Sequence, residues 1–460
     1  MLERISLKLI GLLRALFAVT LFSAATARTY ASEVKLSEHL PENSISGLRA
    51  LLEAAMTEAE SIQLRDLVER DFEGRKIVAK SAKNPQLRTN VTLRKEQDFE
   101  RDDSEISDRL LYSLTLSKSL FHWGALEANR AKGNLNLEIE ELKTFEAYRT
   151  LALDIRKKYL AILVAQKDAD LAQRNLERAQ TRVELERERL KAGTASTIQV
   201  YNLEVALNSA ELDLMKKKNT LADQIDLLAR LSGVPSEEIS SGLLSEIPRQ
   251  AILNASEIAS IEQLFDERLN QGLSVQTQAK SLEFSEKDLH ISNQRLKPKI
   301  GLSVGLTQYE MDEIGRRRAE EIVYAGITIG WSLFDGRATR GNKISAMARI
   351  EHVKRQLESA KSTYEFNLQR TKKLLDLNAR ILERDEEALN QASNYLHDTK
   401  KDFETGRASP DDLEKVEIAF ATQEVRTNRS RSEYHNALAN ISSLLGFDTF
   451  AQKFIDQRSQ

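Results

Sequence analysis

The sequence contains no cysteine, which excludes a disulfide framework, a thiolate metal site and a cysteine nucleophile. Aromatic residues make up only 6% of the 460 residues, whereas charged residues make up 30%. This composition favours long solvated helices over a compact α/β enzyme. Neither sign of charge dominates, because 67 Lys and Arg stand against 70 Asp and Glu. The charge balance therefore gives no reason to expect nucleic acid as a partner.

Long hydrophobic runs are also missing after the first 31 residues. Residues 1–31 begin with basic side chains, continue through the apolar run "ALFAVTLFSAA" and reach small-residue sites ending at Ala27 or Ala31. This layout predicts a secretory signal peptide, and an amphipathic first helix is the alternative. No later stretch has the roughly 18–20 apolar residues of a membrane-spanning helix. If the mature chain enters a membrane, we expect it to do so as strands.

An internal duplication organises the chain. Gly193 corresponds to Gly406 at an offset of 213 residues, and the same offset relates "SLF" at 119–121 to "SLF" at 332–334. The register runs without gaps over about 150 residues and preserves apolar positions as well as identities. Further pairs at this offset are Pro85 and Pro298, Val91 and Val304, Ala195 and Ala408, Ser196 and Ser409, and Leu231 and Leu444.

Both copies read as helix, strand pair, very long helix, glycine break and final helix. The first structural repeat covers 32–232, with helices at about 44–82, 124–192 and 196–232 and strands within about 85–118. A linker rich in Pro, Gly and Ser follows at 233–256. The second repeat covers 257–447, with helices at about 257–296, 336–405 and 409–446 and strands within about 298–331. Residues 448–460 are expected to be a C-terminal tail.

The four expected strands alternate between apolar and small polar residues. In "KIGLSVGLT", for example, Ile300, Leu302 and Val304 face away from Gly301 and Ser303. The charged stretches "RKEQDFERDDSEISD" and "QYEMDEIGRRRAEE" are predicted to be loops between paired strands. The pattern fits either a barrel wall or a small soluble sheet that caps a helical bundle. Four strands cannot close a membrane barrel alone, but two copies supply 2 × 4 = 8 strands and three supply 3 × 4 = 12.

The glycine breaks read as tight helix-to-helix turns. Each follows a helix of about 67 residues, which is about 100 Å long. Gly193 and Gly406 are expected to be helix C-caps with positive φ. A capping box follows each glycine, "STIQ" at 196–199 and "SPDD" at 409–412.

Taken together, these features resemble the TolC family of bacterial outer-membrane efflux proteins. The resemblance rests on the signal peptide, the duplication, the strand pairs ending in "SLF", the long helices, the glycine breaks and the terminal "LSG" and "LLG". It covers essentially the whole mature chain. The fold that it implies is mainly α with a small transmembrane β part: a homotrimer that forms an α-helical barrel and a shared 12-stranded β-barrel.

The resemblance also implies a function, a location and partners. The protein would be a passive channel-tunnel for efflux or type I secretion, located in the outer membrane of a Gram-negative bacterium, in contact with its lipid, and extending into the periplasm. Its partners would be a periplasmic adaptor (membrane fusion) protein and an energised inner-membrane pump of the ABC, RND or MFS type. The alternative is a periplasmic coiled-coil adaptor or scaffold without membrane strands.

Three groups of candidate site residues follow. Acidic side chains after the second glycine break, with one neutral counterpart in the first repeat, are candidates for a periplasmic gate: Asp411, Asp412 and Gln199. Asp412 is equally the third residue of the "SPDD" capping box. The adaptor-docking candidates lie at the two helical tips: Gly193, Thr194, Ala195, Ser196, Gly406, Arg407, Ala408 and Ser409. Trp123 and Trp331 lie where strands end, either as aromatics at a membrane interface or as packing at a strand–helix junction.

No residue pattern calls for catalysis or a cofactor. "GLSVG" at 301–305 matches a nucleophile-elbow motif, but its serine lies within an alternating strand instead of a strand-to-helix turn. The six histidines are scattered without an i, i+4 pair, so no metal site is expected. We therefore predict a protein that is not an enzyme and that binds no cofactor, metal or nucleic acid.

Overall fold

The structure is a computed structural model. It describes residues 38–96, 107–242, 247–249, 252–253, 257–258, 261, 268, 271–313 and 316–458. The predicted signal peptide, residues 1–31, lies outside the described residues. Long helices and one small antiparallel sheet make up the fold, which confirms the mainly α class with a small β part.

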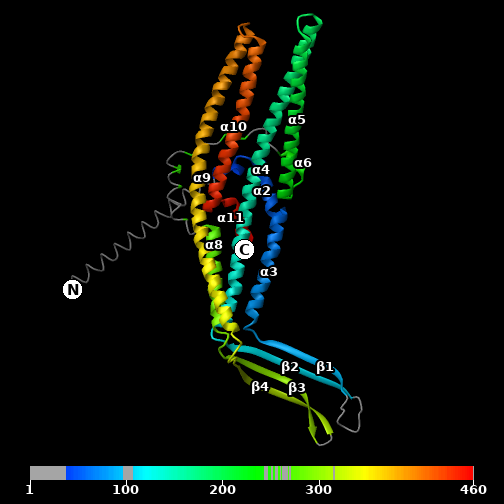
Figure 1. The fold of residues 1–460 in the computed structure, drawn as a ribbon, viewed down its shortest axis with the longest axis vertical. Coiled ribbons are helices and arrows are strands. Elements are labelled where there is room, and N and C mark those ends of the chain that lie inside the picture. Colours follow the sequence, from blue (N-terminus) through cyan, green and yellow to red (C-terminus); the bar gives the residue numbers. More distant parts are fainter. Residues whose placement is uncertain are drawn as a thin grey trace, which may run out of the picture. The chain divides into compact units, whose positions relative to one another are not determined.

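The described elements follow the chain in the order drawn in Figure 1. The helices are η1 Pro41–Asn43, α2 Ser46–Glu58, α3 Glu60–Ser81, α4 Ala125–Lys191, α5 Thr197–Ser232, α6 Ser236–Ser241, α8 Leu273–Asn293, α9 Ala338–Glu404, α10 Pro410–Leu445 and α11 Thr449–Arg458. The strands are β1 Gln86–Glu96, β2 Ser107–Phe121, β3 Lys299–Glu313 and β4 Arg316–Gly330.

Chain contacts divide the molecule into two compact units, and each unit draws on both sequence repeats. Unit 1 comprises the described parts of 1–65, 144–272 and 361–460, and unit 2 comprises 66–143 and 273–360. The long helices α4 and α9 therefore contribute residues to both units.

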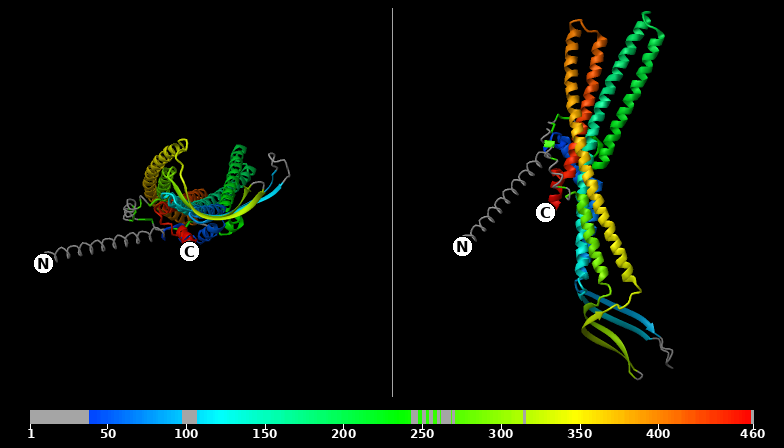
Figure 2. Two further views of the ribbon diagram at one scale, coloured as in Figure 1. Left: turned by 90° about the horizontal axis from the view of Figure 1, so that it is seen from below. Right: turned by 60° about the vertical axis from the view of Figure 1, so that its left-hand side comes forward.

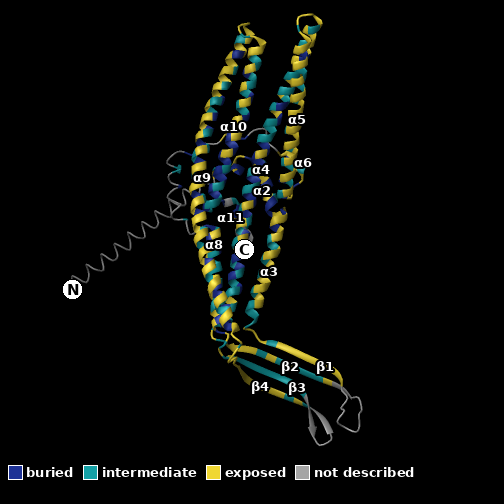
Figure 3. Ribbon diagram, in the orientation of Figure 1, coloured by how far each residue is buried: buried dark blue, intermediate teal, exposed yellow. Residues whose placement is uncertain are grey.

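Unit 1 contains two long helical hairpins, one formed by α4 and α5 and the other by α9 and α10 (Figures 1 and 2). Its apolar core lies at the base of the hairpins, where α2 packs against α4 and the end of α5. Leu52, Ile155, Leu160 and Leu228 are each fully buried there. Farther along the hairpins most residues are exposed or half-buried, and Figure 3 shows buried positions confined to narrow stripes. This pattern fits helices that keep broad polar faces in water.

Unit 2 contains the sheet, in which β1, β2, β3 and β4 are hydrogen-bonded in chain order and every neighbouring pair is antiparallel. Seen from below in Figure 2, the four strands curve together into an arc. A bulge in β2 between Ser119 and Phe121 shifts the register against β3 at one end of the sheet. A bulge bends and twists a strand locally, which helps a sheet to curve.

Two helices predicted from the sequence are interrupted. The helix expected at 44–82 breaks at Ala59, which adopts an extended backbone with φ −60° and ψ 128° and is completely buried. The helix expected at 257–296 is interrupted by the turn at Gln271 and Gly272, and α8 starts only at Leu273. Gly272 lies flat against the Tyr364 ring, since a Cβ would come within 2.8 Å of it. Tertiary packing at these points outweighs local helix preference.

The predicted loops and tail also need correction. The stretch "QYEMDEIGRRRAEE" is largely strand, because β3 continues to Glu313 and β4 starts at Arg316. Likewise β1 extends to Glu96 and β2 begins at Ser107. Charged residues therefore continue the strand ladders past the alternating region. The expected C-terminal tail, 448–460, contains helix α11.

Candidate functional site

One face of the sheet is mainly apolar, although Thr89 and the exposed Lys118 belong to it by register as well. Directly opposed residues of an antiparallel pair point to the same side, so the register brings the predicted apolar positions of all four strands together. Many of these side chains are strongly exposed within one chain, with Leu93 at 79% and Val323 at 78%. The large exposed members of this face are Leu87, Val91, Leu93, Leu110, Leu114, Leu116, Val323, Ile327 and Ile329.

On the side of β4, polar groups limit this apolar face at one end, whereas Leu93 and Leu110 continue it on β1 and β2. The hydroxyl of Tyr112 donates a hydrogen bond to the carboxylate of Glu321, and both residues belong to the apolar face by register. Gln308 lies opposite Glu321 on the neighbouring strand. The apolar residues of β4 therefore lie between Glu321 and Trp331, and 331 − 321 = 10 residues separate these limits.

Trp123 and Trp331 lie at the opposite end of the sheet and bind the same short segment. The indole Nε1 of Trp123 donates to the carbonyl of Pro298 at 2.9 Å, and that of Trp331 donates to the carbonyl of Leu296 at 2.9 Å. Both rings stay accessible, at 42% and 61% exposure. The two readings left open by the sequence are thus compatible, because each indole packs at a strand–helix junction and also presents its ring to the surroundings.

The two edges of the sheet are β1 and β4. Within the described residues, neither strand has a second neighbour. Their outer N–H and C=O groups are therefore available for pairing with another strand. A single chain cannot pair both of these edges by itself.

The face opposite the apolar one is built from small and polar residues. Along β3 it presents Gly301, Ser303, Gly305 and Thr307, in register with serine and threonine of β2. The serine of "GLSVG", Ser303, lies in the middle of β3 and not in a strand-to-helix turn. Ser303 consequently lacks the backbone geometry that a nucleophile elbow needs.

The two helical tips have the same backbone design. At the first tip Thr194 N bonds to Arg189 O at 2.9 Å and Gly193 N bonds to Leu190 O at 3.0 Å. This is a Schellman motif, which requires the positive φ of 75° seen at Gly193. At the second tip Arg407 N bonds to Asp402 O at 2.7 Å, Gly406 N bonds to Phe403 O at 3.0 Å, and φ of Gly406 is 76°.

A reciprocal capping box restarts the chain after each turn. In the first box Gln199 N bonds to the Ser196 hydroxyl and Ser196 N bonds to the Gln199 side chain. In the second box Ser409 and Asp412 make the equivalent pair. Hydrogen bonds from the Ser409 side chain and backbone lower the pKa of Asp412 below its ordinary value. Gln199 and Asp412 are therefore engaged in capping.

Asp411, by contrast, connects the two hairpins. Its carboxylate lies 3.4 Å from Nη2 of Arg182 on α4 and 2.6 Å from Nζ of Lys415. Arg182 also reaches Glu414 of α10 at 3.0 Å. The structure thus brings Asp411 into an inter-helix ion pair, whereas its neighbour Asp412 stays in the cap.

Further ion pairs between α4 and α10 extend this connection, and they escaped the sequence analysis. Lys167 lies 3.0 Å from Glu424, Arg429 lies 3.2 Å from Asp168, and Arg178 lies 3.7 Å from Glu417. The signal was present as opposite charges on the two helices, but their pairing depends on how the hairpins are placed. Of these side chains Arg429 is 55% exposed, whereas Lys167 and Glu424 are half-buried; a solvent-exposed pair contributes at most about 1 kcal/mol.

The remaining tip candidates surround these turns. The guanidinium of Arg407 lies 3.0 Å from Asp402 and donates to the Thr405 hydroxyl, and the side chain is 72% exposed. Thr194 donates its hydroxyl to the Arg189 carbonyl, which closes the first turn further. Ala195 and Ala408 lie between each Schellman glycine and its capping serine.

Among the described residues, no three His, Asp or Glu side chains are grouped as a metal site would require. No described helix is long and apolar enough to cross a membrane.

Comparison with known proteins identifies the fold. Residues 72–234 match the family model "Outer membrane efflux protein". The chain is similar in structure to the outer membrane protein VceC of Vibrio cholerae, with 16% identity, a TM-score of 0.68 and coverage of 87% of this chain and 96% of that one.

Two outer membrane channels show the same likeness. For CmeC of Campylobacter jejuni the identity is 13%, the TM-score 0.71 and the coverage 90% and 89%. For MtrE of Neisseria gonorrhoeae the values are 14%, 0.65, and 87% and 88%. No curated protein sequence matches the chain. Residues 72–234 therefore carry the outer membrane efflux protein domain, and the chain has the fold of the TolC family of outer-membrane channels.

Proposed function

We propose that this protein is a passive outer-membrane conduit that works in export. The observation that carries the proposal is the sheet of unit 2, whose exposed apolar face ends in polar and aromatic groups. An apolar surface of this kind is unfavourable in water and favourable against lipid chains. Nothing in the described residues calls for catalysis, and no enzymatic activity is proposed.

The length of the apolar face supports a membrane span. The ten residue steps from Glu321 of β4 to Trp331 just after it extend about 33 Å at about 3.3 Å per residue. At a strand tilt of about 40° this corresponds to about 25 Å across the membrane, the height of the apolar band of outer-membrane barrels. We assign Trp123 and Trp331 to the periplasmic interface, since their strands continue there into helices.

The open strand edges require further copies of the chain. Lipid offers no hydrogen bonds, so the outer edges of β1 and β4 must be paired inside a membrane. The two edges differ, and pairing β4 of one copy with β1 of the next generates a ring. We propose a homotrimer with 3 × 4 = 12 strands, the number implied by the family resemblance.

The four long helices of unit 1 form a row, and this row also has two outer members. Helix α4 bonds to α5 through Arg187 and Glu204 at 2.6 Å and to α10 through Arg182 and Glu414 at 3.0 Å. Helix α10 in turn bonds to α9, so α5 and α9 lie at the two ends of the row α5–α4–α10–α9. Both end helices carry exposed apolar side chains: Ile198, Tyr201, Val205, Leu212 and Met215 on α5, and Phe366, Leu374, Leu377 and Tyr395 on α9.

The α5 stripe has coiled-coil spacing, with steps of three, four, seven and three residues. We propose that it packs against the α9 stripe of the neighbouring copy. Because the chain has no cysteine, a Val205→Cys and Tyr395→Cys double variant tests this contact. We expect oxidation to link copies into dimers and trimers on a denaturing gel, and each single variant is the control. Failure to crosslink above the single variants would contradict this interface.

The helical tips would face the periplasm and bind the adaptor, which connects the conduit to an inner-membrane pump. The two rigid turns, with Gly193, Arg407 and their neighbours exposed, would form six tips in the trimer. Asp411, held by Arg182, is proposed to narrow the entrance between the hairpins. Transport selectivity would then depend on charge and width, and energy would come from the pump.

Membrane fractionation and planar-bilayer recording test the proposed function. We expect the protein in an outer-membrane pellet that needs detergent for extraction, and we expect stable conductance from the purified protein. Release by salt or osmotic shock, without conductance, would support the periplasmic scaffold instead and would contradict the conduit.

A further inference from the structure

One row of residues crosses the small-residue face of the sheet from edge to edge. The register aligns Arg88 of β1 with Thr115 of β2, Thr115 with Gly305 of β3, and Gly305 with Tyr324 of β4. All four belong to the face opposite the apolar one. Under the proposed function, that face lines the passage through the membrane.

Arg88 is the only charged residue in this part of the face. The row on one side consists of Gln86, Ser117, Ser303 and Gly326, and the row on the other side consists of Asn90, Ser113, Thr307 and Ile322. Arg88 is exposed, and its Nη2 donates to the side-chain oxygen of Gln86 at 2.9 Å. No described carboxylate lies within ion-pair distance of it. Its charge is therefore uncompensated by the wall around it.

Tyr324 lies flat on the wall beside this charge. Its hydroxyl is 3.2 Å from Oγ1 of Thr115, two strands away, so the ring crosses β3. Gly305 makes this possible, because a Cβ there would come within 2.8 Å of the tyrosine hydroxyl and 2.7 Å of the Leu114 carbonyl. The largest side chain described on the face thus stays close to the backbone and leaves the guanidinium open to the passage.

We propose that Arg88 is a selectivity residue that makes the membrane-spanning passage favour anions. The proposal rests on the proposed function and adds a preference that the function does not require. In a homotrimer three guanidinium groups would share one level of a neutral wall. A ring of like charge enclosed by a low-dielectric surround concentrates counter-ions and sets the sign of the permeant ion.

Other charges on the same face lie farther along the strands. Arg94 and Glu320 belong to this face by register beyond the row of Asn90, and they carry opposite signs. Lys299 belongs to the same face at the other end of β3, three rows from Arg88. At the helical tips Asp411 would favour cations, so Asp411 and Arg88 would act in opposite directions. The experiment must therefore separate the strand passage from the helical entrance.

Thiol accessibility tests the orientation of Arg88 first. The chain has no cysteine, so Arg88→Cys and Leu87→Cys each introduce one thiol, on opposite faces of β1. In reconstituted channels we expect a water-soluble thiosulfonate to modify the Arg88→Cys variant and to change its current. The adjacent Leu87→Cys variant should react only with a lipid-soluble maleimide. The reverse pattern would overturn the proposal.

Reversal potentials in a KCl gradient then test selectivity. The recordings use an Asp411→Asn background, which removes the carboxylate proposed to narrow the helical entrance. We expect Arg88→Gln to lower the ratio of Cl⁻ to K⁺ permeability at least about twofold and Arg88→Glu to invert the preference. Arg88→Lys keeps the charge and should keep the ratio. An unchanged ratio in the Gln and Glu variants would overturn the role of Arg88.

These outcomes are distinguishable from failure of the conduit itself. If the unmodified protein gives no conductance, the proposed function fails. If it conducts and the Arg88 variants conduct with an unaltered ion preference, only the selectivity proposal fails. Thermal unfolding of each variant in detergent checks that the assembled protein is intact before recording.

Discussion

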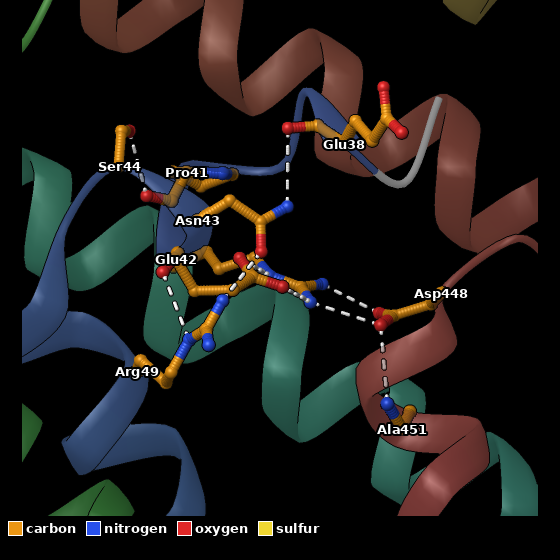
Figure 4. A network of polar contacts seen from close by, with 9 residues as sticks. Glu38, Pro41, Glu42, Asn43, Ser44, Arg49, Asp448 and Ala451 are labelled. Atoms are coloured by element: carbon orange, nitrogen blue, oxygen red, sulfur yellow. Dashed lines mark hydrogen bonds and ion pairs between the residues drawn. The ribbon is translucent and has the colours of Figure 1, made fainter. Parts of the chain in front are cut away.

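Arg156 joins Glu42 and Asp448 in a completely buried ion triad. Its guanidinium donates to Glu42 at 2.5 and 2.9 Å and to Asp448 at 2.6 and 3.0 Å. Figure 4 shows the two carboxylates approaching from the N-terminal segment and from the C-terminal segment beside α11. Burial alone would lower the pKa of Arg156 and raise that of Asp448, but their mutual attraction reverses both directions. The triad thus ties both ends of the described chain to α4.

Removing the arginine should destabilise unit 1 strongly. Arg156→Met leaves two buried carboxylates without a counter-charge, and such losses cost about 3–5 kcal/mol. The matched control is Arg384→Met, because Arg384 is 81% exposed and pairs with Glu387 at 3.1 Å on the surface. The control should cost less than about 1 kcal/mol. Thermal unfolding followed by circular dichroism compares them, and equal midpoints would contradict a structural role for the triad.

Because His435 is buried, we expect the protein to lose stability in mild acid. Burial, together with the nearby charges of Arg431 and His39, lowers its pKa to about 4. The unfolded chain protonates this histidine near pH 6.5 while the folded chain keeps it neutral, so the unfolded state binds more protons as the pH falls between these values. This difference lowers the free energy of unfolding by about 2 kcal/mol at pH 5, and by about 3 kcal/mol once the pH falls below the folded pKa.

The measurement is the unfolding midpoint at pH 7 and pH 5. His435→Gln cannot titrate and should show a smaller drop between the two pH values than the unmodified chain. His397→Gln is the control, because it makes the same substitution at an exposed position on α9. A drop of the same size in the His435→Gln variant would assign the pH dependence to other groups.

Glycines with the same backbone conformation should differ in their tolerance of a side chain. At Gly193 and Gly406 a Cβ would meet no atom within 4 Å, so substitution by alanine costs only the strain of positive φ, about 1–2 kcal/mol. At Gly233, with φ 78°, a Cβ would also lie 2.9 Å from the Glu58 carbonyl. Gly233→Ala should therefore lower the global unfolding midpoint more than Gly193→Ala. Amide exchange should show that the latter loosens only its own tip.

Elements set by local pattern were predictable from the sequence. The helix expected at 124–192 corresponds to α4, Ala125–Lys191, because it lacks proline and carries a regular apolar stripe. The alternation of β3 and β4 likewise indicated one apolar face, which the register now shows. The break at Ala59 was not visible, since alanine favours helix, whereas in the structure Ala59 is fully buried and the Glu58 carbonyl before it lies close to Gly233.

The ion-pair partners of these residues could not be predicted from the sequence, because they depend on the tertiary structure. Arg156 stands in the charged run "DIRKKYL", which reads as a solvated face, yet it occupies the same stripe as the buried Ala152 and Tyr159. Its position in the stripe was the available signal, but its two partners lie more than 100 residues away. Similarly, the sequence marked Asp411 and Asp412 as a pair, and only the hairpin arrangement separates their environments.

The different environments of Asp411 and Asp412 allow a test of the proposed role of Asp411 at the entrance. Asp411→Asn removes the ion pairs to Arg182 and Lys415, while Asp412→Asn makes the same charge change one residue away and retains a side chain that can accept the capping hydrogen bonds. If Asp411 narrows the entrance, its variant should change single-channel conductance and weaken block by a multivalent cation. The Asp412 variant should leave both close to the unmodified values. Because the low pKa of Asp412 keeps it charged at neutral pH, equal effects of the two variants would mean that net charge at the tip, and not the α4–α10 ion pair, governs the entrance.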